Sequence, residues 1–182
     1  MDVILYIQKG ELNMKSNYVV RARKFLESFV PYLIQYKRIE GAVNAYNLRM
    51  RRHVEYHYGA VRRCLCLADY AVKWDYDAEE AKNFGGCEDE VNNYRFAYDH
   101  GYGYLFAEIT RVEVMGRVFY IMPRVKMLGI TTGFYGPDHY LSCDEIDFIY
   151  CVMGLCDLHD ENWGLVYGQV KIIDYACRLT GD

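Results

Sequence analysis

The sequence predicts an α+β fold in which helices come first and short strands and helices follow. Between residues 19 and 39, apolar residues recur at helical spacing, with basic residues on the other faces. From residue 54 to residue 76 the pattern changes to short β-branched and aromatic runs separated by turn residues. Two later segments, 105–125 and 163–173, each hold two such runs around a glycine, which is typical of β-hairpins.

Length and composition are those of one compact domain or a small two-lobed unit. With 182 residues, 52% of them hydrophobic, the chain is long enough to bury a core. No apolar run reaches the roughly 18 residues of a membrane span, and the first residues lack the basic start of a signal peptide. We therefore expect a cytoplasmic protein that does not enter membranes.

Charge is distributed unevenly along the chain. Residues 1–63 carry a balance of +7 and residues 64–182 a balance of −11, which together give the net charge of −4. The acidic main part argues against nucleic acid as the principal partner, because phosphate groups would be repelled. The basic first segment either covers the rest of the molecule or docks on an acidic partner, and both interpretations stay open.

The seven cysteines predict free thiols. They are scattered, and Cys64 and Cys66 have no matching second pair at zinc-ligand spacing. Because these two residues are two positions apart in a predicted strand, their sulfur atoms should project to the same face.

The helices are predicted from apolar spacing and from their ends. In the first stretch Pro31 interrupts the pattern, so we expect a kink or two short helices there, and a second stretch runs from Gly41 to about Arg52. A helix from Glu88 to Tyr98 has acidic residues in its first turn, which suits the positive end of the helix dipole. Another runs from Asp144 to about Leu155, with Ser142 as its cap.

A polar cluster near the C-terminal end carries the strongest functional signal. Asp157 is followed five residues later by Asn162, and then by two β-type runs joined at Gly168-Gln169. Since a hairpin returns its exit to its entry, we expect Asn162 to lie beside Asp174. A side-chain carbonyl oxygen next to a carboxylate suits Mg²⁺, and Asp157 would then be within reach as a base.

The order Asp-Leu-His-x-x-Asn from Asp157 to Asn162, followed by Ile-Ile-Asp-Tyr around Asp174, resembles the catalytic loop and metal motif of kinases. The His after the Asp is shared with aminoglycoside and choline kinases. The block looks most like the small protein kinase-like proteins of tailed bacteriophages. The resemblance assigns catalysis to Asp157, and metal binding to Asn162 and Asp174.

This resemblance implies a protein kinase-like fold with two lobes. Its N-lobe would be an antiparallel five-stranded sheet with one helix, and its helical C-lobe would be strongly shortened. The corresponding parts are a helical extension over residues 1–52, the N-lobe over 53–125, and the C-lobe with the catalytic loop and metal-binding hairpin over 126–182. After Asp174 the motif's Gly is replaced by Ala176, and no activation segment follows.

Upstream, Ala71-Val72-Lys73 resembles the kinase strand whose Lys contacts the α- and β-phosphates. Kinases pair this Lys with a Glu of the following helix, which keeps the Lys on the phosphates. Glu90 is the better match here, and Glu88 is the alternative. The resemblance therefore places Lys73 and Glu90 in the catalytic machinery.

Two further segments are assigned to the nucleotide. Gly59-x-Val61 lies where the kinase glycine-rich loop ends, although Val54 and Tyr56 replace the first two glycines of that pattern. The strand that ends in Met122-Pro-Arg-Val125 resembles a kinase hinge. There Pro123 would supply a carbonyl to adenine and Val125 an N–H donor, with Met122 beside them.

The function implied is an ATP- and Mg²⁺-dependent phosphotransferase that acts on Ser or Thr of a host protein in the host cytoplasm and modulates host processes or defence. Two alternatives stay open. The altered glycine-rich loop and short C-lobe favour an inactive kinase-like protein that inhibits a host enzyme or defence system by direct binding. The Asp-Leu-His loop also fits a small-molecule phosphotransferase. Substrate binding would then need the N-terminal arm, a second chain as in a homodimer, or the target protein itself.

Overall fold

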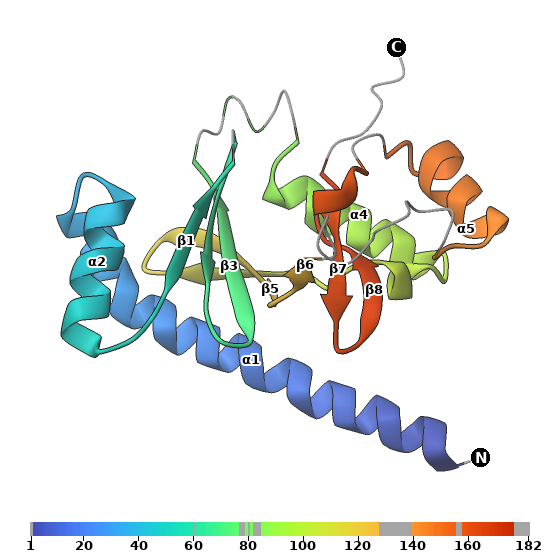
Figure 1. Cartoon of the computed structure of the whole chain (residues 1–182), viewed down its shortest axis with the longest axis horizontal. Coiled ribbons are helices and arrows are strands. Elements are labelled where there is room, and N and C mark those ends of the chain that lie inside the picture. The colour runs from blue at the N-terminus through green and yellow to red at the C-terminus, as the bar shows by residue number, and fades with distance from the viewer. Residues whose placement is uncertain are drawn as a thin grey trace.

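The structure is a computed structural model that describes residues 2–59, 61–76, 79, 81, 85–127, 140–155 and 158–176; for residues 2–16, Met127 and Asp160 it describes the backbone alone. The fold is α+β, as predicted, and it contains a five-stranded antiparallel sheet and a smaller three-stranded sheet (Figure 1). Within the described residues, no helix combines the length and the hydrophobicity needed to cross a bilayer.

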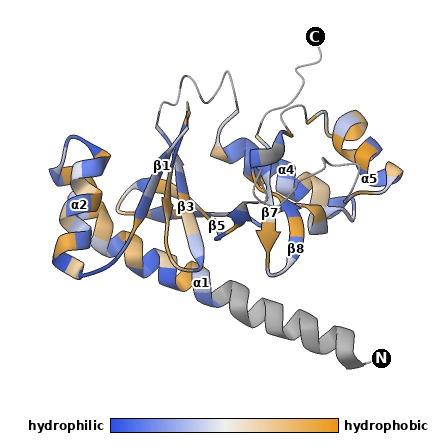
Figure 2. Cartoon of the chain, in the orientation of Figure 1, coloured by the Kyte–Doolittle hydropathy of each residue, from blue (hydrophilic) through white to orange (hydrophobic). Residues whose placement is uncertain are grey.

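Two helices form the N-terminal segment: α1, Asp2–Gln35, and α2, Ile39–Met50. Of the two outcomes expected at Pro31, division into two short helices is excluded, because α1 continues through this residue to Gln35. The flanking Phe29 and Val30 are fully buried, and their burial offsets the hydrogen bond that a helical proline loses. Hydrophilic and hydrophobic residues alternate along α2 and the C-terminal part of α1 (Figure 2).

The larger sheet has the strand order β1-β2-β3-β5-β4, and every neighbouring pair is antiparallel. Helix α4, Cys87–Asp99, and the 3₁₀ turn η1, Gly103–Leu105, connect β3 to β4. The strands are β1 Glu55–Tyr58, β2 Arg62–Cys66, β3 Tyr70–Asp75, β4 Thr110–Val114 and β5 Arg117–Pro123.

Alternation of side chains gives this sheet two different faces. Leu65, Val72 and Ile121 are buried in one hydrophobic cluster with residues of α1 and α2. Helix α1 contacts β3, β4 and β5 on this side. The next residues along the strands, such as Lys73, point to the opposite face. The Sγ atoms of Cys64 and Cys66 lie 3.8 Å apart, which confirms that these two residues share a face.

The C-terminal part has its own hydrophobic cluster, built from α4, the segment after it and the chain beyond residue 148. Ser142 and Glu145 cap each other at the start of the C-terminal helix, as predicted. The elements are β6 Lys126–Met127, α5 Cys143–Asp147, its π-helical continuation η4 Phe148–Val152, the 3₁₀ turn η5 Asp160–Asn162, β7 Trp163–Val166 and β8 Gln169–Ile172.

The predicted hairpin is present as the antiparallel pair β7–β8. Its turn, however, is Tyr167-Gly168 rather than Gly168-Gln169, so the predicted join was wrong by one residue. Both turn residues have positive φ, 50° and 83°, and Gln169 already belongs to β8. A two-residue hairpin turn of this type requires left-handed backbone at both positions, and Gly168 provides one of them without a steric cost.

Candidate functional site

An ion pair lies in the middle of β3, on the face opposite α1. Lys73 Nζ is 3.0 and 3.2 Å from the two carboxylate oxygens of Glu90, which is fully buried in α4. Glu88, the alternative partner, is half exposed and accepts a hydrogen bond from Tyr120. The structure thus pairs Lys73 with Glu90, the residue that the sequence favoured.

The exit of the β7–β8 hairpin reaches this ion pair. Lys73 Nζ donates to the carbonyl of Ile173 over 3.1 Å. The N–H of Ile173 donates to the backbone carbonyl of Asn162 over 2.8 Å. The entry of the hairpin therefore does lie beside its exit, and the exit lies next to Lys73, although one hundred positions separate Lys73 from Ile173.

Helix α4 also holds this exit segment. The buried Asn93 donates from Nδ2 to the carbonyl of Tyr175 over 2.6 Å. The Tyr175 hydroxyl in turn donates to the carbonyl of Ala107. No sequence motif predicts a role for Asn93. A polar residue on the same helix as Glu90, three positions later, was the available signal.

Arg62 is the largest omission of the sequence analysis. Its guanidinium group donates to Glu90 Oε1 over 2.6 Å. It also forms a bidentate ion pair with Asp174, with Nη1 at 2.8 Å from Oδ1 and Nη2 at 2.8 Å from Oδ2. The signal was present in the pattern, because Arg62 shares a strand face with Cys64, whose register partner is Lys73.

The four charged groups form a balanced network of two cations and two carboxylates. Burial raises the pKa of Glu90 to about 7, while Lys73 and Arg62 act in the opposite direction. Burial would also raise the pKa of Asp174, but Lys73 and Arg62 outweigh it and keep that pKa below its ordinary value. Although burial disfavours its charged form, Glu90 and Asp174 raise the pKa of Lys73, so its ammonium group stays protonated.

The donor set at the hairpin fits a Mg²⁺ ion. Asp174 supplies a carboxylate that is one-third exposed, and Asn162 supplies an amide on the adjoining segment. Mg²⁺ takes one or two protein carboxylates and completes its shell with phosphate and water. No group of three or more His, Cys, Asp or Glu ligands occurs among the described residues, so such an ion would take its further ligands from water and from the nucleotide. Both Asp174 oxygens are engaged by Arg62, which would have to move.

A small apolar cluster borders the ionic network. Ala71, Ala107, Met122 and Val166 are buried there, and Val125 and Ile173 pack against them. Val125 also lies so close to Gly164 that a Cβ at this glycine would overlap its side chain. Two of the three predicted hinge residues, Met122 and Val125, therefore lie between the sheet and the hairpin.

The predicted phosphate loop connects β1 to β2, and its residue Ala60 lies outside the described residues. The N–H of Gly59 donates to the carbonyl of Arg62 over 2.9 Å, and Val61 is buried. The Gly59 N–H is thus engaged inside the turn. The structure brings Gly59 and Val61 to the strand end next to Arg62, but it does not leave the Gly59 amide available for a phosphate.

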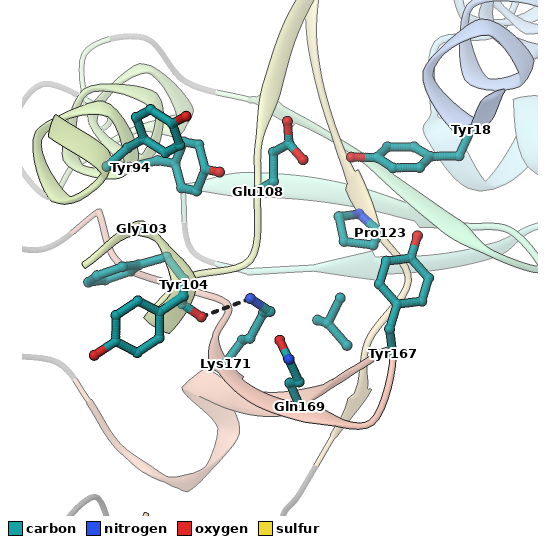
Figure 3. Close-up of a pocket in the computed structure, with 12 residues that line it drawn as sticks. Tyr18, Tyr94, Gly103, Tyr104, Glu108, Pro123, Tyr167, Gln169 and Lys171 are labelled. Atoms are coloured by element: carbon teal, nitrogen blue, oxygen red, sulfur yellow. Dashed lines mark hydrogen bonds between the residues drawn. The ribbon is translucent and has the colours of Figure 1, made fainter. Parts of the chain in front are cut away.

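The third hinge residue, Pro123, lines a separate cavity of about 370 Å³ (Figure 3). Among the described residues that line this cavity, none belongs to the ionic network. Tyr18 and Tyr94 point toward the carboxylate of Glu108 there, and Lys171 bonds the carbonyl of Tyr104 at the opposite side. Met122 and Pro123 are neighbours on β5 and face opposite sides of the strand, which explains why the two residues separate.

The catalytic prediction for Asp157 falls outside the described residues. The chain directly after it is described: the indole Nε1 of Trp163 donates to the carbonyl of Leu158 over 3.2 Å, and both residues are buried. No protein-family model matches this chain, and no curated protein matches its sequence.

Proposed function

We propose that this protein is a kinase-like, ATP- and Mg²⁺-dependent phosphotransferase of phage type that acts on Ser or Thr of a host protein. The observation that carries the proposal is the convergence of Lys73, Glu90 and Asp174. These residues come from a strand, a helix and a hairpin exit, and they meet on one face of the sheet. Phosphoryl transfer depends mainly on positioning and charge, which such a group supplies.

In this proposal each residue has a separate task. Lys73 holds the α- and β-phosphates and Glu90 orients Lys73. Asp174 and Asn162 hold Mg²⁺, which would neutralise charge on the phosphates. Asp157 positions or deprotonates the acceptor hydroxyl.

The adenine ring would lie against the apolar cluster. Ala71 and Met122 are buried at the sheet side of that cluster, and Val125 follows at the strand exit. A flat apolar base next to a charged phosphate site suits this division between an apolar patch and an ionic network.

A second function, direct inhibition of a host enzyme or defence system without catalysis, is favoured by two observations. Arg62 holds both oxygens of Asp174, and the Gly59 amide is engaged in its own turn. A site that stays in this arrangement binds no metal and transfers no phosphate. The protein would then act through its surface.

The experiment combines Mg-ATP binding with phosphate transfer. A ligand at 100 times its Kd stabilises a folded protein by about 2.7 kcal/mol, which a thermal melt detects. Labelled transfer to host lysate proteins is then compared between the unchanged protein, Asp174→Asn, and the exposed control Asp99→Asn on α4. We expect transfer to be lost in Asp174→Asn alone.

The other outcomes separate the candidates. A thermal shift without transfer to host proteins would contradict the protein kinase activity and would leave either a small-molecule acceptor or a nucleotide-binding protein that lacks catalysis. The absence of a shift at millimolar Mg-ATP would favour the inhibitory binding protein and contradict the phosphotransferase.

A further inference from the structure

Arg62 lies close enough to Lys73 for both residues to contact the phosphates of a bound nucleotide. It is the first residue of β2, directly after the β1–β2 turn. Its guanidinium group and Lys73 Nζ both contact Glu90 Oε1, at 2.6 and 3.0 Å. A phosphate held by Lys73 would therefore be within reach of Arg62. A guanidinium group matches phosphate with two parallel hydrogen bonds.

The turn before Arg62 gives a reason why such a cation is needed. A glycine-rich loop holds phosphates with backbone N–H groups. Here Val54 and Tyr56 stand at two of the glycine positions, and the Gly59 N–H is engaged by the Arg62 carbonyl. The side chains of Val54 and Tyr56 hinder close approach of a phosphate to the backbone there, and the Gly59 N–H is occupied. Arg62 offers side-chain donors at the same end of the strand.

The contact between Arg62 and Asp174 must break before Asp174 can bind a metal ion. The guanidinium group occupies both carboxylate oxygens, so a metal ion and Arg62 compete for the same atoms. Both side chains are accessible from solvent, Arg62 at 22% and Asp174 at 33%. The exchange therefore requires a side-chain rotation and no opening of the hydrophobic clusters.

We propose that Arg62 binds the phosphates of the nucleotide and releases Asp174 to the metal ion when the metal–nucleotide complex enters. Without nucleotide, Arg62 holds Asp174 in place of the metal. This inference deepens the proposed function and depends on it for the nucleotide. The hold on Asp174 can be measured without any nucleotide.

The test measures two ligands on the same variants. Mn²⁺ alone, followed by the electron paramagnetic resonance signal of the free ion, reports access to Asp174. Mg-ATP, followed by calorimetry, reports the phosphate contact. Arg62→Gln should bind Mn²⁺ about tenfold or more tightly than the unchanged protein, because a competing cation is gone, and Mg-ATP about tenfold or more weakly. Arg62→Lys keeps the charge without the two-pronged geometry and should lie between.

Two control variants test whether the opposite changes in Mn²⁺ and Mg-ATP affinity come from Arg62 and its contact with Asp174. Arg95→Gln removes an exposed arginine of α4 and should alter neither affinity. Adding Asp174→Asn to Arg62→Gln should abolish the gain in Mn²⁺ binding.

Each remaining outcome contradicts one part of the proposal about Arg62. If Arg62→Gln leaves Mn²⁺ binding unchanged, or the gain survives Asp174→Asn, the hold on Asp174 is wrong. If Arg62→Gln raises the affinity for both Mn²⁺ and Mg-ATP, Arg62 only blocks the site and its proposed contact with phosphate is wrong. If no variant binds Mg-ATP, the proposed function and the phosphate role fail together, while the Mn²⁺ result still decides the hold on Asp174.

Discussion

The two faces of the five-stranded sheet are stabilised in different ways. On one face Leu65, Val72 and Ile121 pack against α1 and α2, without a charged group among the buried residues that the structure describes there. On the other face Arg62 and Lys73 meet carboxylates that come from a helix and a hairpin. The same strands contribute to both faces, because alternate residues point in opposite directions.

The difference shows which face supports the fold and which supports the proposed chemistry. Burying apolar area is favourable in itself, and the rings of Phe25, Phe29 and Tyr46 add edge contacts at 5.3 to 5.5 Å. Buried ion pairs recover little more than the cost of removing their charges from water. We infer that the charged face is retained for binding, and four predictions test this comparison.

The largest expected effect is on the apolar face. Phe29→Ala should lower the free energy of unfolding by about 3–5 kcal/mol, because it leaves a cavity between α1 and its neighbours. Urea unfolding measures the loss. Val20→Ala, at an exposed position of the same helix, is the control and should change stability by less than about 0.5 kcal/mol. Equal effects of the two variants would mean that α1 is not part of the core.

On the charged face, removing both partners of the Lys73–Glu90 ion pair should cost less stability than removing Glu90 alone. Glu90→Leu leaves Lys73 without its buried carboxylate and should cost about 3 kcal/mol. Combining it with Lys73→Met should recover most of that stability while Mg-ATP binding stays lost. Calorimetric melting and titration measure the two quantities. A double variant as unstable as Glu90→Leu alone would show that the ion pair itself supports the fold.

The contribution of Asp174 to stability should be lost at acidic pH. Its pKa in the folded protein lies below the ordinary value of 3.8, so its ionised form stabilises the fold above that pH and the contribution disappears as pH falls through the folded pKa. Asp174→Asn should cost about 1–3 kcal/mol at pH 7, since it breaks the two-pronged contact with Arg62. The difference from the unchanged protein should shrink below about pH 4. A pH-independent difference would contradict the ion pair.

The smallest effect is expected at the hairpin turn. Gly168 has φ of 83°, and a Cβ added at this position would meet no described atom within 4 Å. Gly168→Ala should therefore cost only about 1 kcal/mol, through backbone strain. Gly168→Asn should cost less, because Asn tolerates left-handed backbone. Thermal melts of the two variants measure this order. A reversed order would place the cost in side-chain contacts.

Much of the local structure followed from sequence patterns. Helical spacing predicted α1 and α2, alternation predicted the strands, and the Gly168 region predicted a hairpin. The pairing of Lys73 with Glu90 followed from the kinase resemblance. The strand and helix patterns place Arg62 and Asn93 on the same faces as Lys73 and Glu90, but not beside Asp174 and Tyr175. These partners lie about 80 to 110 positions away, so the two contacts were missed.

The sequence by itself determined where helices and strands form and which residues of each strand share a face, because these properties depend on local periodicity and turn chemistry. Only the tertiary structure decided that α1 covers one face of the sheet, that Pro123 lines a cavity while Met122 joins the apolar cluster, and that Arg62 holds Asp174. Each of these depends on how distant segments pack and on which charges must be neutralised once they are removed from water.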